Sequence, residues 1–334
     1  MKKWRFAALL IGCGLLIWGG TGFGLENALY PYKMGKTFGY INKKGNVVVS
    51  PQFDNALDFS EGLGAVLVNI RWGYVNGSGQ FVINPQYNDA DLFSEGLARI
   101  RVGGPINGKY GYIDRTGKIV IAPQFLRAWR FTSGLALVKI GERYGYIDKA
   151  GRVVIGAQYL EGEPFMDGRA LVRTDKYYGF INQAGEMVIG AQFVKARSFS
   201  EGVAAVKTGK TWGYINPSGQ LVIASQYLEA DPFSEGLAVA RIGSFLNGKY
   251  GYINRTGAVV INPQFDKASH FSEGLAAVKF QDQWGFIDTK GNVVIAPIFN
   301  EVGDFKGGVA RVALRDGSIG YIDRTGRYIY GPVK

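Results

Sequence analysis

The chain has 334 residues, of which 47% are hydrophobic and 14% aromatic, and its formal net charge at pH 7 is +11. This apolar fraction argues against disorder after Thr37, because enough apolar surface is present to form a core. A single cysteine, Cys13, and a single histidine, His270, exclude intramolecular disulfides, histidine-based catalytic triads and multi-histidine metal sites.

Residues 1–24 predict a secretion signal or a membrane anchor. Met1–Arg5 is positively charged, and no charged residue occurs from Phe6 to Gly24. As a helix, this run would be just long enough to cross the hydrocarbon core of a bilayer. Three alternatives remain open: a cleaved signal peptide, an uncleaved anchor, and a lipoprotein modified at Cys13. All three place residues 25–334 outside the cytoplasm.

After this segment, one β-hairpin repeats about every 34 residues. In its clearest copy, an alternating strand at Trp212–Asn216 runs into a Pro-Ser-Gly turn, and Leu221–Ile223 returns as a second strand. Asparagine can close an Asx turn, and glycine can adopt the left-handed conformation that a tight β loop needs. The hairpins start at Phe38, Trp72, Tyr110, Tyr144, Tyr178, Trp212, Tyr250, Trp284 and Ile319.

Each hairpin is followed by a connector and a short third strand. The connector contains a second phenylalanine that usually begins Phe-Ser-Glu-Gly, as in Phe233–Gly236, and an apolar strand such as Leu275–Val278 follows. We therefore expect each repeat to be a three-stranded antiparallel meander with a connector of about a dozen residues. The connector phenylalanines are Phe59, Phe93, Phe131, Phe165, Phe199, Phe233, Phe271 and Phe305.

Two further repeated residues suggest roles in packing. A glycine follows each leading aromatic, and we expect an aromatic side chain, with the connector phenylalanine as the candidate, to cover its bare backbone. A glutamine lies between apolar neighbours at the end of most hairpins, and we expect a buried amide that bonds connector backbone groups. These glutamines are Gln52, Gln86, Gln124, Gln158, Gln192, Gln226 and Gln264.

The Trp-Gly-Tyr-Ile-Asn hairpin, the Pro-Gln-Phe segment and the Phe-Ser-Glu-Gly-Leu segment together resemble the bacterial WG repeat family. The resemblance extends roughly from Phe38 to Tyr330. It implies a β-rich tandem-repeat protein, of a kind often found among bacterial envelope or secreted proteins, with no recognised catalytic residues. Phenylalanine or tyrosine replaces the leading tryptophan in several copies, and each keeps a large ring before the glycine.

We predict an all-β array of about nine three-stranded meanders in residues 25–334, in which a four-repeat block is duplicated at a spacing of 140 residues. Counted from Ala28 to Tyr330, every unit is complete, and none is split between the termini to close a ring. This arrangement favours an open β-solenoid or superhelix. The alternative is a β-propeller, whose usual four to eight blades fit nine units poorly.

The sequence favours a protein that is not an enzyme and has no cofactor. Glycoside hydrolysis needs two carboxylates in different environments, whereas equivalent repeats supply equivalent environments. We therefore predict a non-catalytic extracytoplasmic binding or scaffold protein. The alternatives are an envelope glycan hydrolase that uses the connector carboxylates, and a purely structural spacer. These carboxylates are Glu61, Glu95, Glu201, Glu235 and Glu273.

The basic residues are spread through the predicted turns and do not form one block. Such a surface attracts anionic polymers. We expect the partner to be a protein or an anionic cell-envelope polymer and do not expect nucleic acid. Membrane contact is expected only through residues 1–24, if that segment is uncleaved.

Two insertions in the repeat are candidate contact loops. They lie near Gly103–Lys109 and Gly243–Lys249, and each lengthens the turn between a third strand and the next hairpin. Their tips carry apolar residues where solvent-facing residues are expected, which favours a contact surface. The alternative is neutral drift in a duplicated loop. The candidate contact residues are Pro105, Ile106, Asn107, Phe245, Leu246 and Asn247.

Overall fold

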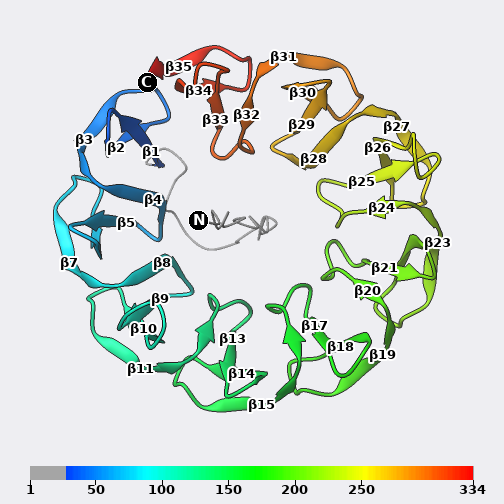
Figure 1. The fold of residues 1–334 in the computed structure, drawn as a ribbon, viewed down its shortest axis with the longest axis horizontal. Helices are drawn as coiled ribbons and strands as arrows, with labels where there is room; N and C mark the ends of the chain where they lie inside the picture. Colours follow the sequence, from blue (N-terminus) through cyan, green and yellow to red (C-terminus); the bar gives the residue numbers. More distant parts are fainter. Residues whose placement is uncertain (1–27, 334) are drawn as a thin grey trace, which may run out of the picture.

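The computed structural model describes residues 28–333, in which every regular element is a β-strand. The strands form nine antiparallel sheets arranged as the blades of a ring (Figure 1). The leader predicted at residues 1–24 lies outside the described residues. Within residues 28–333, the structure contains no helix long and apolar enough to cross a membrane.

The blades are numbered along the chain. Blade 1 contains β1 (Leu29–Met34), β2 (Thr37–Asn42) and β3 (Val47–Phe53). Blade 2 contains β4 (Asn55–Ser60), β5 (Leu63–Val68), β6 (Arg71–Val75) and β7 (Phe81–Tyr87). Blade 3 contains β8 (Asp89–Ser94), β9 (Leu97–Val102), β10 (Lys109–Asp114) and β11 (Ile119–Phe125). Blade 4 contains β12 (Arg127–Ala128), β13 (Leu135–Ile140), β14 (Arg143–Asp148) and β15 (Val153–Tyr159). Blade 5 contains β16 (Glu161–Gly162), β17 (Ala170–Arg173), β18 (Tyr178–Ile181) and β19 (Met187–Phe193).

The remaining four blades follow the same order. Blade 6 contains β20 (Lys195–Ala196), β21 (Ala204–Thr208), β22 (Thr211–Ile215) and β23 (Leu221–Tyr227). Blade 7 contains β24 (Glu229–Ala230), β25 (Leu237–Ile242), β26 (Lys249–Asn254) and β27 (Val259–Phe265). Blade 8 contains β28 (Lys267–Ser272), β29 (Leu275–Phe280), β30 (Gln283–Asp288) and β31 (Val293–Phe299). Blade 9 contains β32 (Glu301–Val302), β33 (Val309–Ala313), β34 (Ile319–Asp323) and β35 (Tyr328–Val333).

Blades 2 to 9 have four strands each, not the three predicted. The first strand of each blade lies nearest the ring axis and the fourth lies at the rim, so we call them the inner and outer strands (Figure 1). The inner strand comes from the segment predicted as a connector, and in five blades only two residues of it pair. Blade 1 lacks an inner strand, so β1 and β2 correspond to the second and third strands of the other blades.

The predicted open solenoid is wrong, because blade 9 packs against blade 1 and closes the ring. Tyr32 and Ile41 of blade 1 share one buried cluster with Val309 and Tyr321 of blade 9. The Tyr321 hydroxyl donates a hydrogen bond to the carbonyl of Pro31. The prediction that no unit is split between the termini is correct, and closure is achieved by packing between two complete sheets.

A taper in side-chain size matches the curvature of the ring. A small residue occupies the second position of most inner strands, whereas a buried aromatic ends each outer strand from β3 to β31. Small residues near the axis let sheets converge there, and aromatic rings at the rim hold them apart. The small residues are Ala56, Ala90, Ala128, Gly162, Ala196, Ala230 and Ala268.

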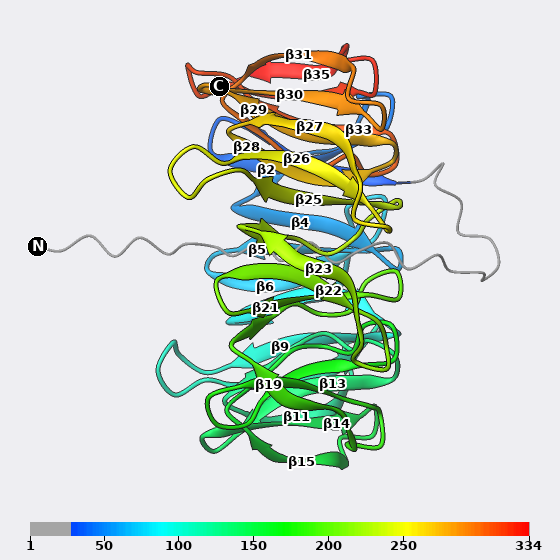
Figure 2. The same ribbon diagram turned by 90° about the vertical axis from the view of Figure 1, so that its right-hand side faces the viewer.

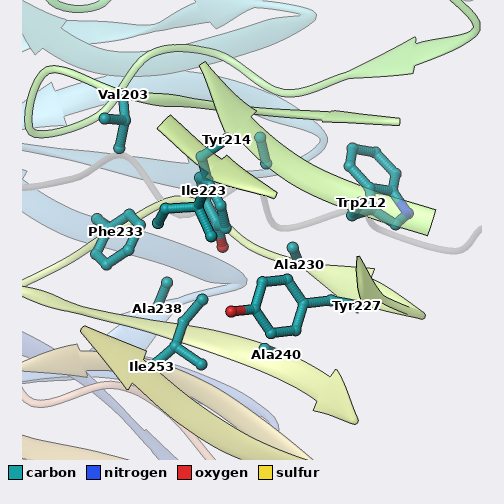
Figure 3. Packing of buried hydrophobic residues seen from close by; sticks show 11 residues of the cluster. Val203, Trp212, Tyr214, Ile223, Tyr227, Ala230, Phe233, Ala238, Ala240 and Ile253 are labelled. Atoms are coloured by element: carbon teal, nitrogen blue, oxygen red, sulfur yellow. The ribbon is translucent and has the colours of Figure 1, made fainter. Parts of the chain in front are cut away.

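The hydrophobic core lies between neighbouring blades. In the cluster between blades 6 and 7, Tyr214 and Ile223 from one blade contact Phe233 and Ile253 from the next (Figure 3). The rings of Tyr214 and Phe233 have centroids 4.9 Å apart. The Tyr214 hydroxyl also donates to the carbonyl of Asp231, at 2.7 Å. The connector phenylalanine therefore joins two blades.

The strand glycine makes room for backbone, not for an aromatic ring as predicted. In blade 6, a Cβ atom added to Gly213 would lie 2.5 Å from the carbonyl oxygen of Ile223 on the outer strand. The pairing register between β22 and β23 shifts on either side of Tyr214, which is the signature of a bulge. The outer strand therefore bends over the glycine, and any larger residue would collide with it.

The predicted burial of the repeated glutamines is also wrong. In each outer strand that carries one, the glutamine is exposed and the following aromatic is buried. A strand sends alternate side chains to opposite sides, so the inward aromatic directs its neighbour toward solvent. Gln158 and Gln226 contact the hydroxyls of the tyrosines that follow them, at 3.4 Å and 3.2 Å.

We predict that Gly213→Ala lowers the free energy of unfolding by about 1–3 kcal/mol, since the new methyl group must displace outer-strand backbone. Gly190→Ala is the matched control. Gly190 lies on an outer strand with nothing within 4 Å of an added Cβ, so its replacement should be neutral or slightly stabilising. Chemical denaturation of both variants measures the difference. Equal effects would contradict the bulge interpretation.

Candidate functional site

The two faces of the ring carry different turns. We define the loop face as the one formed by the turns between the second and third strands, such as β5–β6, β9–β10 and β25–β26. Figure 2 shows the two longest of these turns projecting from the same side of the ring. The Ser-Glu-Gly turns and the hairpin turns lie at the opposite ends of the strands, on the other face.

The Ser-Glu-Gly turns bind each blade to the next. The Ser60 hydroxyl donates to the carbonyl of Phe93, one blade further on, at 2.7 Å. The Glu61 carboxylate accepts a hydrogen bond from the backbone N–H of Gly96, at 3.0 Å. The same carboxylate-to-glycine contact recurs at Glu95, Glu201, Glu235 and Glu273. We call this set of contacts the belt.

The belt explains the residues that the hydrolase alternative depends on. All five carboxylates accept backbone N–H groups of the following repeat, and each lies in a similar setting. Glu61, Glu95, Glu201, Glu235 and Glu273 also have positive φ angles between 51° and 55°, so they are part of the turn itself. Within residues 28–333, no group of histidine, cysteine or acidic side chains could hold a metal ion.

Residues near the axis form ion pairs that differ between repeats. Asp91 on β8 accepts a hydrogen bond from Arg130 Nε at 2.8 Å and lies 3.3 Å from Arg99. Burial acts to raise the pKa of Asp91, but the hydrogen bond from Arg130 and the charges of Arg99 and Arg130 outweigh it. The pKa of Asp91 therefore lies below its usual range.

Asp231 occupies the matching position 140 residues later and has the opposite shift. Its carboxylate lies 2.7 Å from Arg197, and the place of Arg99 is taken by Val239. Burial outweighs the charge of Arg197, and the neighbouring Glu229 adds to the effect, so the pKa of Asp231 is raised. The duplicated block has therefore diverged electrostatically at its inner wall.

We predict opposite effects of Asp91→Asn and Asp231→Asn at pH 7. The folded-state pKa of Asp91 lies below its unfolded value, so its stabilisation is complete above about pH 4 and is lost as the pH falls through the folded pKa. Its replacement should cost about 2 kcal/mol at pH 7 and little in strong acid.

The raised pKa of Asp231 means that its ionised carboxylate costs stability above the folded pKa. Asp231→Asn removes that cost, so this variant should be as stable as the parent or slightly more stable at pH 7. Urea unfolding at several pH values measures both variants. A comparable loss of stability from the two substitutions would contradict the assignment.

The loop at Gly243–Gly248 is ordered by its own polar contacts. The Gly248 N–H donates to the Ser244 carbonyl at 2.7 Å, and Arg241 donates to the carbonyls of Gly248 and Phe245 at 3.1 Å and 3.3 Å. These contacts leave Phe245 80% exposed and Leu246 86% exposed. The backbone is therefore held in place while two large apolar side chains point into solvent.

A groove of about 630 Å³ lies beside this loop. Its walls include Arg241, Leu246, Tyr250 and the ion pair between Lys249 and Asp266. Its lining is mainly polar and charged, and Leu246 marks its apolar edge. Asn247 also lines the groove, so two of the predicted contact residues belong to it.

The loop at Gly103–Gly108 lies four blades away on the same face. The Gly108 N–H donates to the Gly104 carbonyl at 2.8 Å, and the Gly103 N–H donates to Asn88 at 2.9 Å. Ile106 at its tip is 94% exposed. The two loops lie almost across the ring from each other (Figure 1), so the predicted residues share a face but form no single pocket.

Sequence reasoning missed Ile70, in the turn between β5 and β6. Asn69 and Ile70 have φ angles of 48° and 64°, and Ile70 is 81% exposed. A β-branched residue rarely adopts a positive φ, because its Cβ crowds the backbone. The detectable signal was an isoleucine in a two-residue turn where blades 4 and 6 have Gly141 and Gly209 as the first residue and a charged second residue.

Basic side chains surround these tips. Counted from the last two residues of the second strand to the first of the third, every turn of the loop face carries at least one lysine or arginine. These residues are Lys33, Lys36, Arg71, Arg101, Lys109, Lys139, Arg143, Arg173, Lys176, Lys207, Lys210, Arg241, Lys249, Lys279 and Arg315. The acidic residues of the same turns are Glu142, Asp175, Asp282 and Asp316. The ring therefore gathers on one face charges that are scattered along the sequence.

The architecture defines a β-propeller of nine blades. The chain belongs to the family of proteins with the WG containing repeat, whose model matches residues 38–69, 72–104, 110–144, 144–178, 178–212, 212–244, 250–283 and 284–316. A comparison with curated proteins found no match.

Two solved structures illustrate the similarity of fold. The crystal structure of BamB from Moraxella catarrhalis aligns with a TM-score of 0.50 and 12% identity, over 80% of this chain and 96% of BamB. Hsv2p from Kluyveromyces lactis aligns with a TM-score of 0.41 and 10% identity, over 57% of this chain and 71% of Hsv2p. At these identities, BamB supports the propeller fold alone.

We predict that Ile70→Gly raises the free energy of unfolding by about 1 kcal/mol. The change creates Asn-Gly, the pair best suited to a turn with two positive φ angles, and removes the crowding at Cβ. Lys210→Gly is the control, because Lys210 is absent from the positive-φ residues and its replacement relieves no strain. Thermal and chemical unfolding measure both variants. A loss of stability at position 70 would contradict the strain.

Proposed function

We propose that this propeller is a non-catalytic interaction scaffold that works outside the cytoplasm and uses its loop face as the contact surface. The observation that carries the proposal is the position of Ile70, Ile106, Phe245 and Leu246. These are the large apolar side chains with the greatest exposure among the described residues, and all four lie on this face. Exposed apolar residues at ordered loop tips are typical of contact surfaces.

The division of labour within the repeat supports this proposal. The shared aromatic, serine and glutamate residues are occupied by contacts between blades. The insertions make no comparable contact between blades, yet their backbones are held by hydrogen bonds. An ordered loop that contributes little to the ring is available for recognition. A non-catalytic role is also in line with the belt carboxylates, which are engaged by backbone N–H groups.

The location outside the cytoplasm rests on the sequence. Residues 1–24 combine a positive start with a long uncharged apolar run, which suits a secreted or membrane-anchored chain of the cell envelope. The absence of a second cysteine is compatible with any compartment. The alternatives that remain are an envelope glycan hydrolase and a spacer without a partner.

We predict that shortening both insertions abolishes partner binding with little effect on stability. Deleting residues 104–107 and 244–247 restores the 34-residue spacing and leaves short turns like those of the other blades. Because loop length affects closure entropy only weakly, the change in free energy of unfolding should stay below about 1 kcal/mol. Pull-downs from envelope fractions and a glycan array compare the variant with the parent.

The matched control replaces Val259 and Val260 by serine. These exposed residues lie on the outer strand β27, away from the loop face. This control should bind like the parent. Binding retained by the double deletion would overturn the contact surface, whereas a parent with no saturable ligand would support the spacer. Release of sugars from the array that depends on the belt glutamates would support the hydrolase.

A further inference from the structure

We propose that the loop face docks on a bilayer with anionic headgroups, into which Ile70, Ile106, Phe245 and Leu246 insert. This inference rests on the proposed function and names the partner of the same surface. It adds a second membrane contact to the one expected through residues 1–24. The argument has three parts: the spacing of the tips, the charge around them and the strain at one of them.

The tips are spread around one face instead of forming a continuous patch. They belong to blades 2, 3 and 7, and the two long loops project from the same side of the ring (Figure 2). A protein interface usually buries a contiguous apolar core inside a polar rim. A bilayer presents one apolar layer everywhere beneath its headgroups. Separate tips that share a plane can therefore all reach it at once.

A basic residue follows each tip closely. Arg71 follows Ile70 directly, Lys109 ends the first insertion and Lys249 ends the second. Apolar side chains below the headgroups and cations at the level of the phosphates form the pattern of an interfacial contact. An anionic wall polymer would use the charges but would leave the apolar tips in water. The combination of both features therefore selects lipid.

Ile70 supplies an independent observation. It keeps a β-branched side chain at a φ of 64° and 81% exposed, although glycine or asparagine fits that conformation better. Strain at an exposed position suggests that the side chain is needed there for contact. The structure thus presents an apolar residue at the expense of turn geometry.

The test places an environment-sensitive NBD label on the second loop of the full chain. Cys13 is the only cysteine, so Cys13→Ser combined with Phe245→Cys gives a single labelling site. Vesicles of phosphatidylglycerol and phosphatidylcholine should shift the emission to the blue, and pure phosphatidylcholine should do so far less. High salt should reduce the shift, because the Debye length falls from about 8 Å at 0.15 M to about 3 Å at 1 M.

The control carries the same label at Val260→Cys on the outer strand. An anchor in residues 1–24 would bring both labelled chains to the vesicle, but only the label on the loop should enter the apolar layer. Ile70→Gly, added to the loop-labelled chain, should weaken the vesicle-dependent signal about tenfold, since one buried side chain is lost. This effect would be opposite in sign to its predicted gain in stability.

The outcomes separate this inference from the proposed function. Unchanged emission at position 245 with anionic vesicles, or the same shift at position 260, would overturn membrane docking. If a protein or a glycan still bound the parent and failed to bind the shortened variant, the contact surface would stand with a different partner. Failure of both experiments would remove the proposed function as well.

Discussion

Each sheet of this protein has two apolar faces, and the structure depends on covering both. The inner seven blades are covered by their neighbours on either side. In an open array, Tyr32 and Ile41 would remain exposed at one end, and Val309 and Tyr321 at the other. These residues cover one another when the ring closes. Burial of the two terminal faces therefore favours the ring, with no exchange of strands between termini.

The repeat satisfies this requirement with very few residues. The connector phenylalanine packs on the tyrosine of the previous blade, and the belt adds hydrogen bonds from serine hydroxyls and to glutamate carboxylates. Because these contacts use the inner part of the blade and the opposite face, the loop face is free to vary. Its insertions, its strained isoleucine and its basic turns can change without disturbing the core. This separation makes the loop face the natural place for function.

The duplicated four-repeat block shows how such variation arises. Asp91 and Asp231 hold equivalent positions, yet one is stabilised by two arginines and the other by one. Similarly, Asp266 pairs with Lys249 beside the second insertion, whereas Leu126 stands at the matching place beside the first. Equivalent backbones thus present different chemistry. Recognition by this protein therefore depends on the departures from the repeat more than on the repeat itself.

The sequence by itself determined the hairpins, their period, the duplication and the two insertions, because strand alternation and turn residues act over short distances. Only the tertiary structure decided the closure, the fourth strand and the sharing of one face by distant loops. Closure depends on small angles between blades that accumulate around the ring. The fourth strand depends on pairing as short as Arg127–Ala128. The shared face depends on blades far apart in sequence, because the ring alone brings Ile70, Ile106 and Phe245 to the same side.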